Sequence, residues 1–421
     1  MRILHVSPSY FPCLGGAQLH LQEVSERLVS RGHDVTVLTA NVTSAWNLSA
    51  CRYGDLPEAE IINGVKVVRF RPDGGLVGSA VARWLELRGG HRSLGLLFTR
   101  DGRDLIRQGP RSAFPIIRSI LRSRADVVAT MNWFWPVAYY AYLARKIKAF
   151  PLVGIPLFHP AEAWAHRDSY ERMLSQCDAV VTNTAFEADF ARQRGASRVE
   201  VGGVGIEPRA FTKRNGAAIR ARYRLGDRPV VGFVGRQTPN KGIHVILEAI
   251  RQVWAWNPEV RLVLAGPKPE PSSPVESLLE TFSPTERDRI VRIHDFEERE
   301  KASIYDAFDL LVLPSIGESF GLAYLEAWAC NKPVIGARIG PTECVIDEGV
   351  DGFLVDPDDA DALACRIKEL LSDPAKRERM GRSGHDKTMA RFTWDQVTDK
   401  VERLYRDLVA ARHRGAAPAE R

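Results

Sequence analysis

The chain has 421 residues, of which 45% are apolar and 26% charged, a balance typical of a folded protein with two or three domains. No apolar run approaches the about 20 residues that span a bilayer, and the first residues do not resemble a signal peptide, so integral membrane proteins are excluded. Six cysteines without a Cys-x-x-Cys pair predict reduced thiols and a cytoplasmic location, and the net charge of +6 favours an anionic partner.

The first forty residues predict a strand, a helix and a second strand. Residues 3–6 and 35–38 are short, mostly apolar runs typical of buried strands, and apolar residues recur at helical spacing between them. A loop rich in proline and glycine, residues 8–16, joins the first strand to the helix. Such a crossover unit implies a parallel sheet.

The same plan returns after residue 230. Residues 230–234 and 262–264 are apolar runs, with a loop at 235–242 and a helical pattern between them. Further strands are expected at 310–313, 333–336 and 353–355. Two such openings predict two doubly wound α/β domains, and the glycine-rich stretch 200–208 is the best candidate for the linker.

Ligands of doubly wound sheets bind beyond the carboxyl ends of the strands, so the loops after the strands are the places to look for function. In the loop 235–242, Arg236 and Lys241 flank a helix start, whose free N–H groups carry partial positive charge. This arrangement suits a diphosphate. Isolated loop cations are more often solvated, but the strand-loop-helix placement favours an anion clamp. Because both are loop cations, we expect their removal to affect folding little.

The loop at 314–322 leads into a helix and carries two glutamates. Glu318 lies in the loop, where a carboxylate can hold sugar hydroxyls, and Glu326 lies on the first or second helical turn, where it can hold a ribose diol. Taken alone, two such glutamates would more often be solvated. The backbone N–H groups expected to face a ligand are those of Phe320, Gly321 and Leu322.

The first domain offers weaker candidates. Gly15 and Gly16 lie between strand and helix and could approach a phosphate or an acceptor, although a Gly-Gly pair is more often only a turn. His159 ends the apolar run 151–158, where it could donate to a sugar or transfer a proton, although a lone histidine is more often structural.

Several enzyme classes lack their motifs here. No Gly-x-Gly-x-x-Gly follows either opening strand, and no Gly-x4-Gly-Lys-Ser/Thr occurs, which argues against nicotinamide dehydrogenases and P-loop NTPases. His and Cys show no zinc spacing. The acidic run ending at Asp359 is expected to cap a helix that begins near Ala360 rather than to bind a metal.

Taken together, these motifs resemble those of the retaining nucleotide-sugar glycosyltransferases of glycosyltransferase family four, which have the GT-B fold. Glu318 and Glu326 match the family's Glu-x7-Glu motif, with Phe-Gly-Leu between them. The loop from Arg236 to Lys241 is similar to its diphosphate clamp. Further similarities are the glycine loop at Gly15 and Gly16, the strand-end His159, and the Phe-Thr-Trp at 392–394 that precedes the family's C-terminal helix.

The resemblance implies an α/β fold of the GT-B type, with two Rossmann-like doubly wound domains facing a cleft. Residues 1–207 would form the acceptor-side domain and residues 208–391 the nucleotide-sugar domain. Residues 392–421 would form a helix that crosses back to the first domain, followed by a frayed tail from about residue 411.

The resemblance also implies the reaction: transfer of a hexose-type sugar, with retention, from a nucleotide-diphosphate sugar to an acceptor hydroxyl. The acceptor (a glycan, a lipid-linked molecule or a small molecule) is not identified. No cofactor or divalent metal is expected. The implied roles are catalysis for Glu318 and His159, ribose binding for Glu326, an acceptor-side position for Gly15, and diphosphate binding for Arg236, Lys241, Gly16, Phe320, Gly321 and Leu322.

Two other functions stay open: an inactive GT-B protein that binds sugars or regulates, and another GT-B enzyme such as an epimerase or an inverting transferase. Release of nucleotide only in the presence of an acceptor would distinguish a transferase from both. Nucleic acid is not expected as a partner, since no binding module is visible.

The stretch 79–124 carries ten arginines against three acidic residues, a net charge of +7, interleaved with apolar residues. Such a segment can lie on an anionic membrane surface. It is equally compatible with surface helices whose arginine stems pack on the core.

Overall fold

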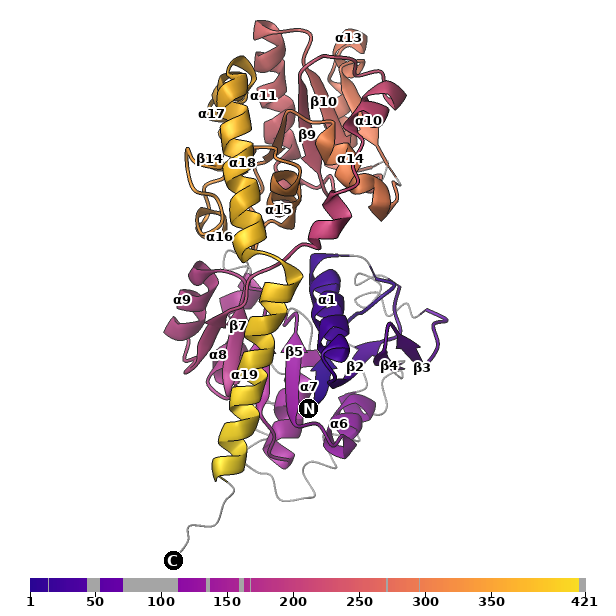
Figure 1. The fold of residues 1–421 in the computed structure, drawn as a ribbon, viewed down its shortest axis with the longest axis vertical. Helices are drawn as coiled ribbons and strands as arrows, with labels where there is room; N and C mark the ends of the chain where they lie inside the picture. Colours follow the sequence, from indigo (N-terminus) through magenta and orange to yellow (C-terminus); the bar gives the residue numbers. More distant parts are fainter. Residues whose placement is uncertain are drawn as a thin grey trace, which may run out of the picture. The chain divides into compact units, whose positions relative to one another are not determined.

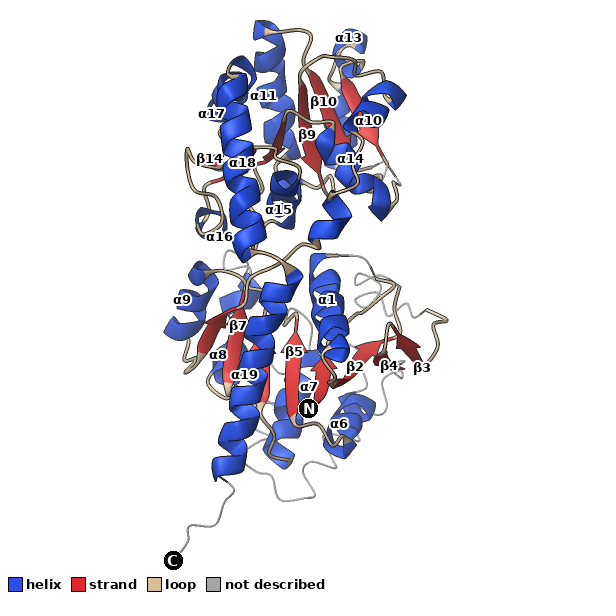
Figure 2. Cartoon of the chain, in the orientation of Figure 1, coloured by secondary structure: helices blue, strands red, loops and turns tan. Residues whose placement is uncertain are grey.

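The computed structural model describes residues 1–13, 15–43, 54–70, 113–133, 137–158, 163–166, 168–269, 272–294 and 296–415. The chain divides into two compact units, one formed by Met1–Gly203 with Trp394–Arg421 and the other by Val204–Thr393. Each unit contains a β-sheet with helices packed against it (Figures 1 and 2). The predicted α/β class is confirmed.

The first unit, within the described ranges, is built on an eight-stranded sheet of order β3-β4-β2-β1-β5-β6-β7-β8. All neighbouring strands are parallel except β3, which runs antiparallel to β4. The strand order reverses between β1 and β5. The strands are β1 (Arg2–Val6), β2 (Asp34–Ala40), β3 (Ala59–Ile62), β4 (Val65–Phe70), β5 (Val127–Met131), β6 (Leu152–Ile155), β7 (Ala179–Thr182) and β8 (Val199–Val201).

The helices of the first unit include the predicted one after β1, whose apolar residues are buried as expected. They are α1 (Gly16–Ser30), α6 (Ala113–Arg122), α7 (Val137–Ile147), α8 (Asp168–Leu174), α9 (Ala185–Gln193) and α19 (Trp394–Gly415), with a short 3-10 helix η1 (Ala163–His166). Because α19 continues to Gly415, the expectation of fraying from residue 411 is wrong for its first five residues.

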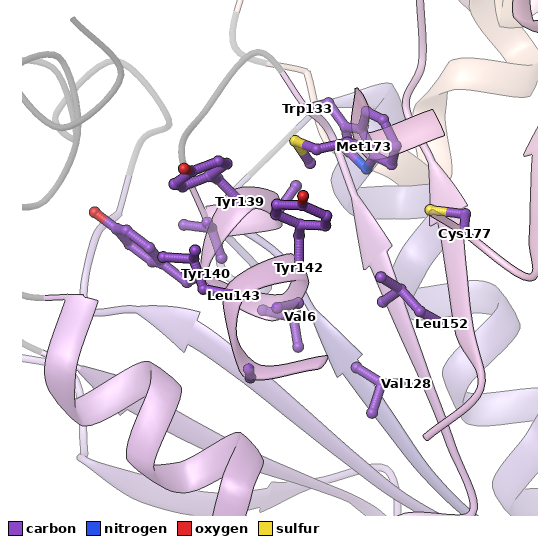
Figure 3. Close-up of a cluster of buried hydrophobic side chains, with 14 of the residues drawn as sticks. Val6, Val128, Trp133, Tyr139, Tyr140, Tyr142, Leu143, Leu152, Met173 and Cys177 are labelled. Carbon is purple, nitrogen blue, oxygen red and sulfur yellow. The ribbon is translucent and has the colours of Figure 1, made fainter. Parts of the chain in front are cut away.

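The core of the first unit joins strand and helix residues near the middle of the sheet (Figure 3). Val6, Val128 and Leu152 of three neighbouring strands lie under Tyr139 and other residues of α7, all nearly inaccessible to water. Trp133, just beyond β5, is fully buried, and its indole Nε1 donates to Thr130 Oγ1 at 2.9 Å. This packing fixes the backbone at the carboxyl ends of the central strands.

Polar and aromatic contacts hold helix α19 against the other elements of the first unit. Arg31 pairs with Glu402 at 2.8 Å and with Asp399 at 2.7 Å. Inside the unit, His5 Nε2 lies 3.2 Å from the Tyr405 hydroxyl, and the buried ring of His20 lies edge-on to Trp394. The C-terminal helix is therefore an integral part of the first unit.

Helix α6 explains part of the basic stretch. Its Ile116, Ile117 and Ile120 are buried in the core, where α6 packs on α7, whereas Arg118 and Arg122 are exposed. The alternation of basic and apolar residues in this part is that of an ordinary surface helix. These isoleucines are not available to enter a bilayer. Residues 71–112 lie outside the described part of the chain, so the membrane hypothesis for them stays a prediction.

The second unit has a sheet whose described strands run in the order β11-β10-β9-β12-β13-β14, all parallel. They are β9 (Val230–Val234), β10 (Arg261–Ala265), β11 (Ile290–Ile293), β12 (Leu310–Leu313), β13 (Val334–Ala337) and β14 (Gly352–Val355). Five of these were predicted. The edge strand β11 was not, because it is short and only Ile293 is fully buried.

Helices flank this second sheet (Figure 2). They are α10 (Gly216–Arg222), α11 (Ile243–Trp256), α12 (Pro274–Glu280), α13 (Pro284–Arg287), α14 (Lys301–Asp306), α15 (Leu322–Ala329), α16 (Gly340–Glu343), α17 (Ala360–Ser372) and α18 (Pro374–Arg391), with 3-10 turns η2 (Pro208–Phe211), η3 (Pro239–Lys241) and η4 (Glu298–Glu300). Asp359 caps α17 as predicted, accepting from the Ala362 N–H at 2.8 Å.

Candidate functional site

The strand order of the second unit reverses between β9 and β12, which are neighbours in the sheet. The two loops singled out by the sequence follow these two strands, and they bond to each other. The backbone carbonyl of Asn240 accepts hydrogen bonds from the Ile316 N–H at 3.1 Å and from Ser315 Oγ at 2.9 Å. Gly242 adopts a left-handed conformation, and a Cβ there would overlap the Pro314 carbonyl. The two motifs therefore form a single edge at the topological switch point, where doubly wound sheets bind ligands.

Lys241 and Glu318 are an ion pair across these two loops. Lys241 Nζ also donates to the Gly317 carbonyl at 3.3 Å. The two side chains are only 16% and 12% exposed, so neither is a solvated surface charge. The expectation that loss of Lys241 would affect folding little is revised, because its removal leaves a carboxylate largely out of water without a partner.

Arg236 differs from Lys241 in its surroundings. Its side chain is exposed at the start of the β9 loop, and no ion pair connects it to any residue that the structure describes. A guanidinium offers five N–H donors in a planar fork that fits phosphate oxygens. Arg236 is thus the cation of this edge that an incoming anion can reach without displacing a protein carboxylate.

Helix α15 begins at Leu322, four residues after Glu318, and presents its positive end at the same edge. Gly321 is the N-cap with φ 93°, and no side chain caps the helix there. A Cβ at Gly321 would overlap the Tyr324 ring, whose hydroxyl donates to the Leu313 carbonyl at 2.8 Å. Phe320 is buried against Phe392, and Leu322 opens the helix. Glycine at position 321 lets the backbone turn over Tyr324 and leaves the first N–H groups uncapped.

Glu326 lies on the second turn of α15 and is 5% exposed. Its Oε1 pairs with Lys301 Nζ at 2.5 Å, and its Oε2 accepts from the Tyr305 hydroxyl at 2.6 Å. Burial opposes the charge on Lys301, but attraction to Glu326 and Glu298 outweighs it and holds the pKa of Lys301 above its usual value. Burial, together with the Glu326 charge, raises the pKa of Tyr305 well above its usual value.

Sequence reasoning missed Lys301 and Tyr305. They sit in the short helix α14, one turn apart, and nothing in their spacing indicates that both point at a carboxylate on another helix. The predicted roles of Glu318 and Glu326 remain predictions, but both side chains are held in fixed places by lysines.

The glycine loop of the first unit lies at the start of α1, where Gly15 is the N-cap without a side-chain cap. A Cβ at Gly16 would meet nothing within 4 Å. Around this loop, Gln18 Nε2 donates to Ser9 Oγ at 2.7 Å, and Arg69 donates to the Phe11 carbonyl at 2.8 Å. Because these glycines belong to the first unit, their share in a donor site with the second unit's residues stays a prediction.

His159 lies outside the described residues. The five cysteines that the structure describes are free. Across the described ranges, no cluster of three or more His, Cys, Asp or Glu is arranged to hold a metal ion, and no helix is both long and apolar enough to cross a membrane.

Comparison with known proteins identifies the class. The family model "Glycosyl transferase 4-like domain" matches residues 15–205, and "Glycosyl transferases group 1" matches residues 217–387. Together with two Rossmann-like sheets, these matches define a glycosyltransferase with the GT-B fold. The chain belongs to glycosyltransferase family four, as its paired glutamates and cationic loop indicated.

Relatives of similar length support this assignment. The chain is 27% identical to the D-inositol 3-phosphate glycosyltransferase of Stackebrandtia nassauensis, over 97% of this chain and 91% of the relative. It is 29% identical to the enzyme of the same name from Acidothermus cellulolyticus, over 99% of this chain and 91% of the relative.

Solved structures share the fold. Sucrose-phosphate synthase of Thermosynechococcus elongatus matches with a TM-score of 0.74 and 22% identity, over 97% of this chain and 99% of that one. Anabaena HepE in complex with UDP and glucose matches with a TM-score of 0.75 and 18% identity, over 97% and 100%.

Proposed function

We propose that the chain transfers a hexose-type sugar from a nucleoside-diphosphate sugar to an acceptor hydroxyl, with retention of configuration and without a divalent metal. One observation carries this proposal. At the β9–β12 edge, Arg236, Lys241 and the uncapped start of α15 gather positive charge beside Glu318, and Glu326 follows on the same helix. This is the set of groups that a diphosphate, a sugar and a ribose require.

In this proposal Arg236, Lys241 and the N–H groups of Phe320, Gly321 and Leu322 hold the diphosphate, with Gly16 of the first unit. Glu318 holds hydroxyls of the donor sugar, and Glu326 holds the ribose. UDP is the first nucleotide to test, because solved structures of HepE contain it. Two cations and a helix start would neutralise the leaving group without a metal ion.

The reaction breaks the bond between the sugar C1 and the phosphate oxygen, and the departing diphosphate keeps the electron pair. The acceptor oxygen forms its bond to C1 on the same face, and its proton passes to the departing phosphate oxygen. Glu318 would stabilise the oxocarbenium-like transition state through the sugar hydroxyls, and His159 would donate to the sugar. The configuration at C1 is therefore retained.

An inositol phosphate is the first acceptor to test, because the relatives of similar length are D-inositol 3-phosphate glycosyltransferases. Gly15, the N-cap of α1, is proposed to lie on the acceptor side. We propose a cytoplasmic location, in keeping with the free cysteines and the nucleotide-sugar donor.

The experiment measures nucleotide release from a panel of UDP, GDP and ADP sugars, with and without D-inositol 3-phosphate. We expect release that depends on the acceptor and persists in EDTA, and the loss of most of it in Arg236→Ala. Calorimetric binding of the free nucleotides tests the donor site independently of the acceptor. Binding of nucleotide sugars without turnover on any acceptor would indicate an inactive protein. Conversion of the donor without an acceptor would indicate another GT-B enzyme, and activity restored only by Mg²⁺ or Mn²⁺ would contradict metal independence.

A further inference from the structure

We propose that Lys301 is a positioning residue for the nucleotide: it holds Glu326 as a buried, charged acceptor of the ribose diol and so determines the preference for a ribonucleotide. This inference rests on the proposed function, because it concerns the same donor site. Lys301 lies outside the Glu-x7-Glu motif, on helix α14, which carries none of the predicted site residues.

Helix α14 holds the Glu326 carboxylate through two donors. Lys301 and Tyr305 lie one turn apart on α14, and each contacts a different oxygen of Glu326, at 2.5 Å and 2.6 Å. Tyr305 is fully buried, and the Lys301 side chain is 16% exposed. The carboxylate is therefore fixed from one side by two donors of a single helix.

The Glu326 carboxylate has more acceptor positions than these two donors use. An ionised carboxylate has about four acceptor positions, two on each oxygen, and no donor. Lys301 occupies one position on Oε1 and Tyr305 one on Oε2. Among the described residues no further donor contacts these oxygens, so one position on each remains, which matches the two neighbouring hydroxyls of a ribose. A ligand without the 2′-hydroxyl would leave one of these positions unused.

Lys301 also balances the charge of Glu326. A carboxylate this deeply buried needs a counter-charge to stay ionised, because burial without one favours the neutral acid. Lys301 is the cation that contacts it, and Glu298, the other partner of Lys301, is 81% exposed. A neutral Glu326 would carry a proton on one oxygen and could no longer accept from both hydroxyls. Lys301 thus preserves the acceptor character of Glu326.

The experiment compares the affinities of UDP and 2′-deoxy-UDP by calorimetry, for the full chain and for Lys301→Met. A hydrogen bond to a charged group supports a preference of roughly 10- to 100-fold, and we expect the wild type to prefer UDP to that extent. In Lys301→Met the preference should fall to about 3-fold or less at pH 7 and recover as the pH rises, because the unpaired carboxyl then ionises. If the role of Lys301 were purely structural, its loss would lower the affinity for UDP and for 2′-deoxy-UDP equally at every pH.

Matched variants separate charge from shape. Lys301→Arg should keep the preference, and Glu298→Gln should leave it unchanged. Lys301→Gln, which keeps a donor but not the charge, should behave like Lys301→Met and replaces it if the methionine variant does not fold. Tyr305→Phe should lower the preference without making it depend on pH.

The outcomes distinguish the two proposals. If the wild type prefers UDP, and Lys301→Met or Lys301→Gln keeps the full preference at pH 7, then the role of Lys301 is overturned. The proposed function is not affected by that outcome. A wild type that binds no nucleoside diphosphate overturns the proposed function and the role of Lys301 with it.

Discussion

Replacing Lys241 with alanine tests the donor edge most directly, because the structure predicts two separate losses. Lys241 is the partner of Glu318, with both side chains mostly shielded from water, and it is also proposed to neutralise the leaving diphosphate. Arg236→Ala is the matched control. Its side chain is exposed and has no ion pair within the described residues, so only the second loss should occur there.

The magnitudes follow from the surroundings. A hydrogen bond to a charged group is worth about 1.5–3 kcal/mol, so either substitution should lower kcat/KM by roughly 10- to 150-fold if the contact exists in the transition state. Lys241→Ala also leaves Glu318 unpaired at 12% exposure. An unpaired, mostly buried acceptor costs about 1–3 kcal/mol, so the free energy of unfolding should fall by that amount. Arg236→Ala should change it by about 0.5 kcal/mol or less.

The assay combines urea unfolding with acceptor-dependent nucleotide release. Lys241→Ala should lose both stability and activity, and Arg236→Ala only activity. The double variant Lys241→Ala/Glu318→Gln should regain part of the lost stability, because no unpaired charge remains, but none of the activity. Near-normal transfer by a variant lacking both Arg236 and Lys241 would refute the clamp. Wild-type stability of Lys241→Ala would refute the argument from the ion pair.

Two further predictions concern the reaction and the first unit. The first-formed product should have the anomeric configuration of the donor by NMR, and Glu318→Gln should lower kcat by a larger factor than it changes the affinity for the nucleotide. An inverted product would place the enzyme in another class. Burial lowers the pKa of His5 to about 3 and that of His20 to about 4, whereas the unfolded chain binds these protons near pH 6.5. Their contribution to stability is thus complete above pH 6.5 and is lost as the pH falls toward 4, with a slope of up to about 1.4 kcal/mol per pH unit for each histidine. His20→Leu should flatten the decline in urea midpoint between pH 6.5 and 4.5, and an unchanged decline would contradict the assignment.

Five strands of the second sheet could be predicted, and in the first sheet β1 and β2, whereas β5 and β7 were not predicted although all their residues are buried. The runs at 3–6 and 230–234 are mostly apolar segments next to a loop that contains glycine, a pattern typical of a buried strand at the start of a crossover unit. The edge strand β11 escaped prediction because Arg292 interrupts it and three of its four residues are only half-buried. An edge strand needs less apolar surface, so its pattern is weak.

The residues of the donor edge could be predicted as loops that follow strands, but their partners could not. The ion pair of Lys241 and Glu318 joins residues 77 positions apart, and Tyr305 reaches Glu326 across 21. Neither separation is a helical or strand repeat. These contacts exist because β9 and β12 are neighbours in the sheet and α14 packs beside α15. Only the folded structure shows these two arrangements.

The charges of the donor edge also suggest an order of events. Lys241 with Glu318 and Lys301 with Glu326 are two neutral pairs, so Arg236 and the start of α15 are what first attracts a diphosphate. For Lys241 to neutralise the phosphate, Glu318 must give it up and accept sugar hydroxyls instead. A nucleotide without a sugar offers Glu318 no such replacement, so phosphate and Glu318 compete for Lys241. Glu318→Gln removes this competition, and it should tighten the binding of UDP while it weakens that of the UDP sugar. Calorimetry with both ligands measures the two changes, and a loss of affinity for UDP would show that the pair does not oppose donor binding.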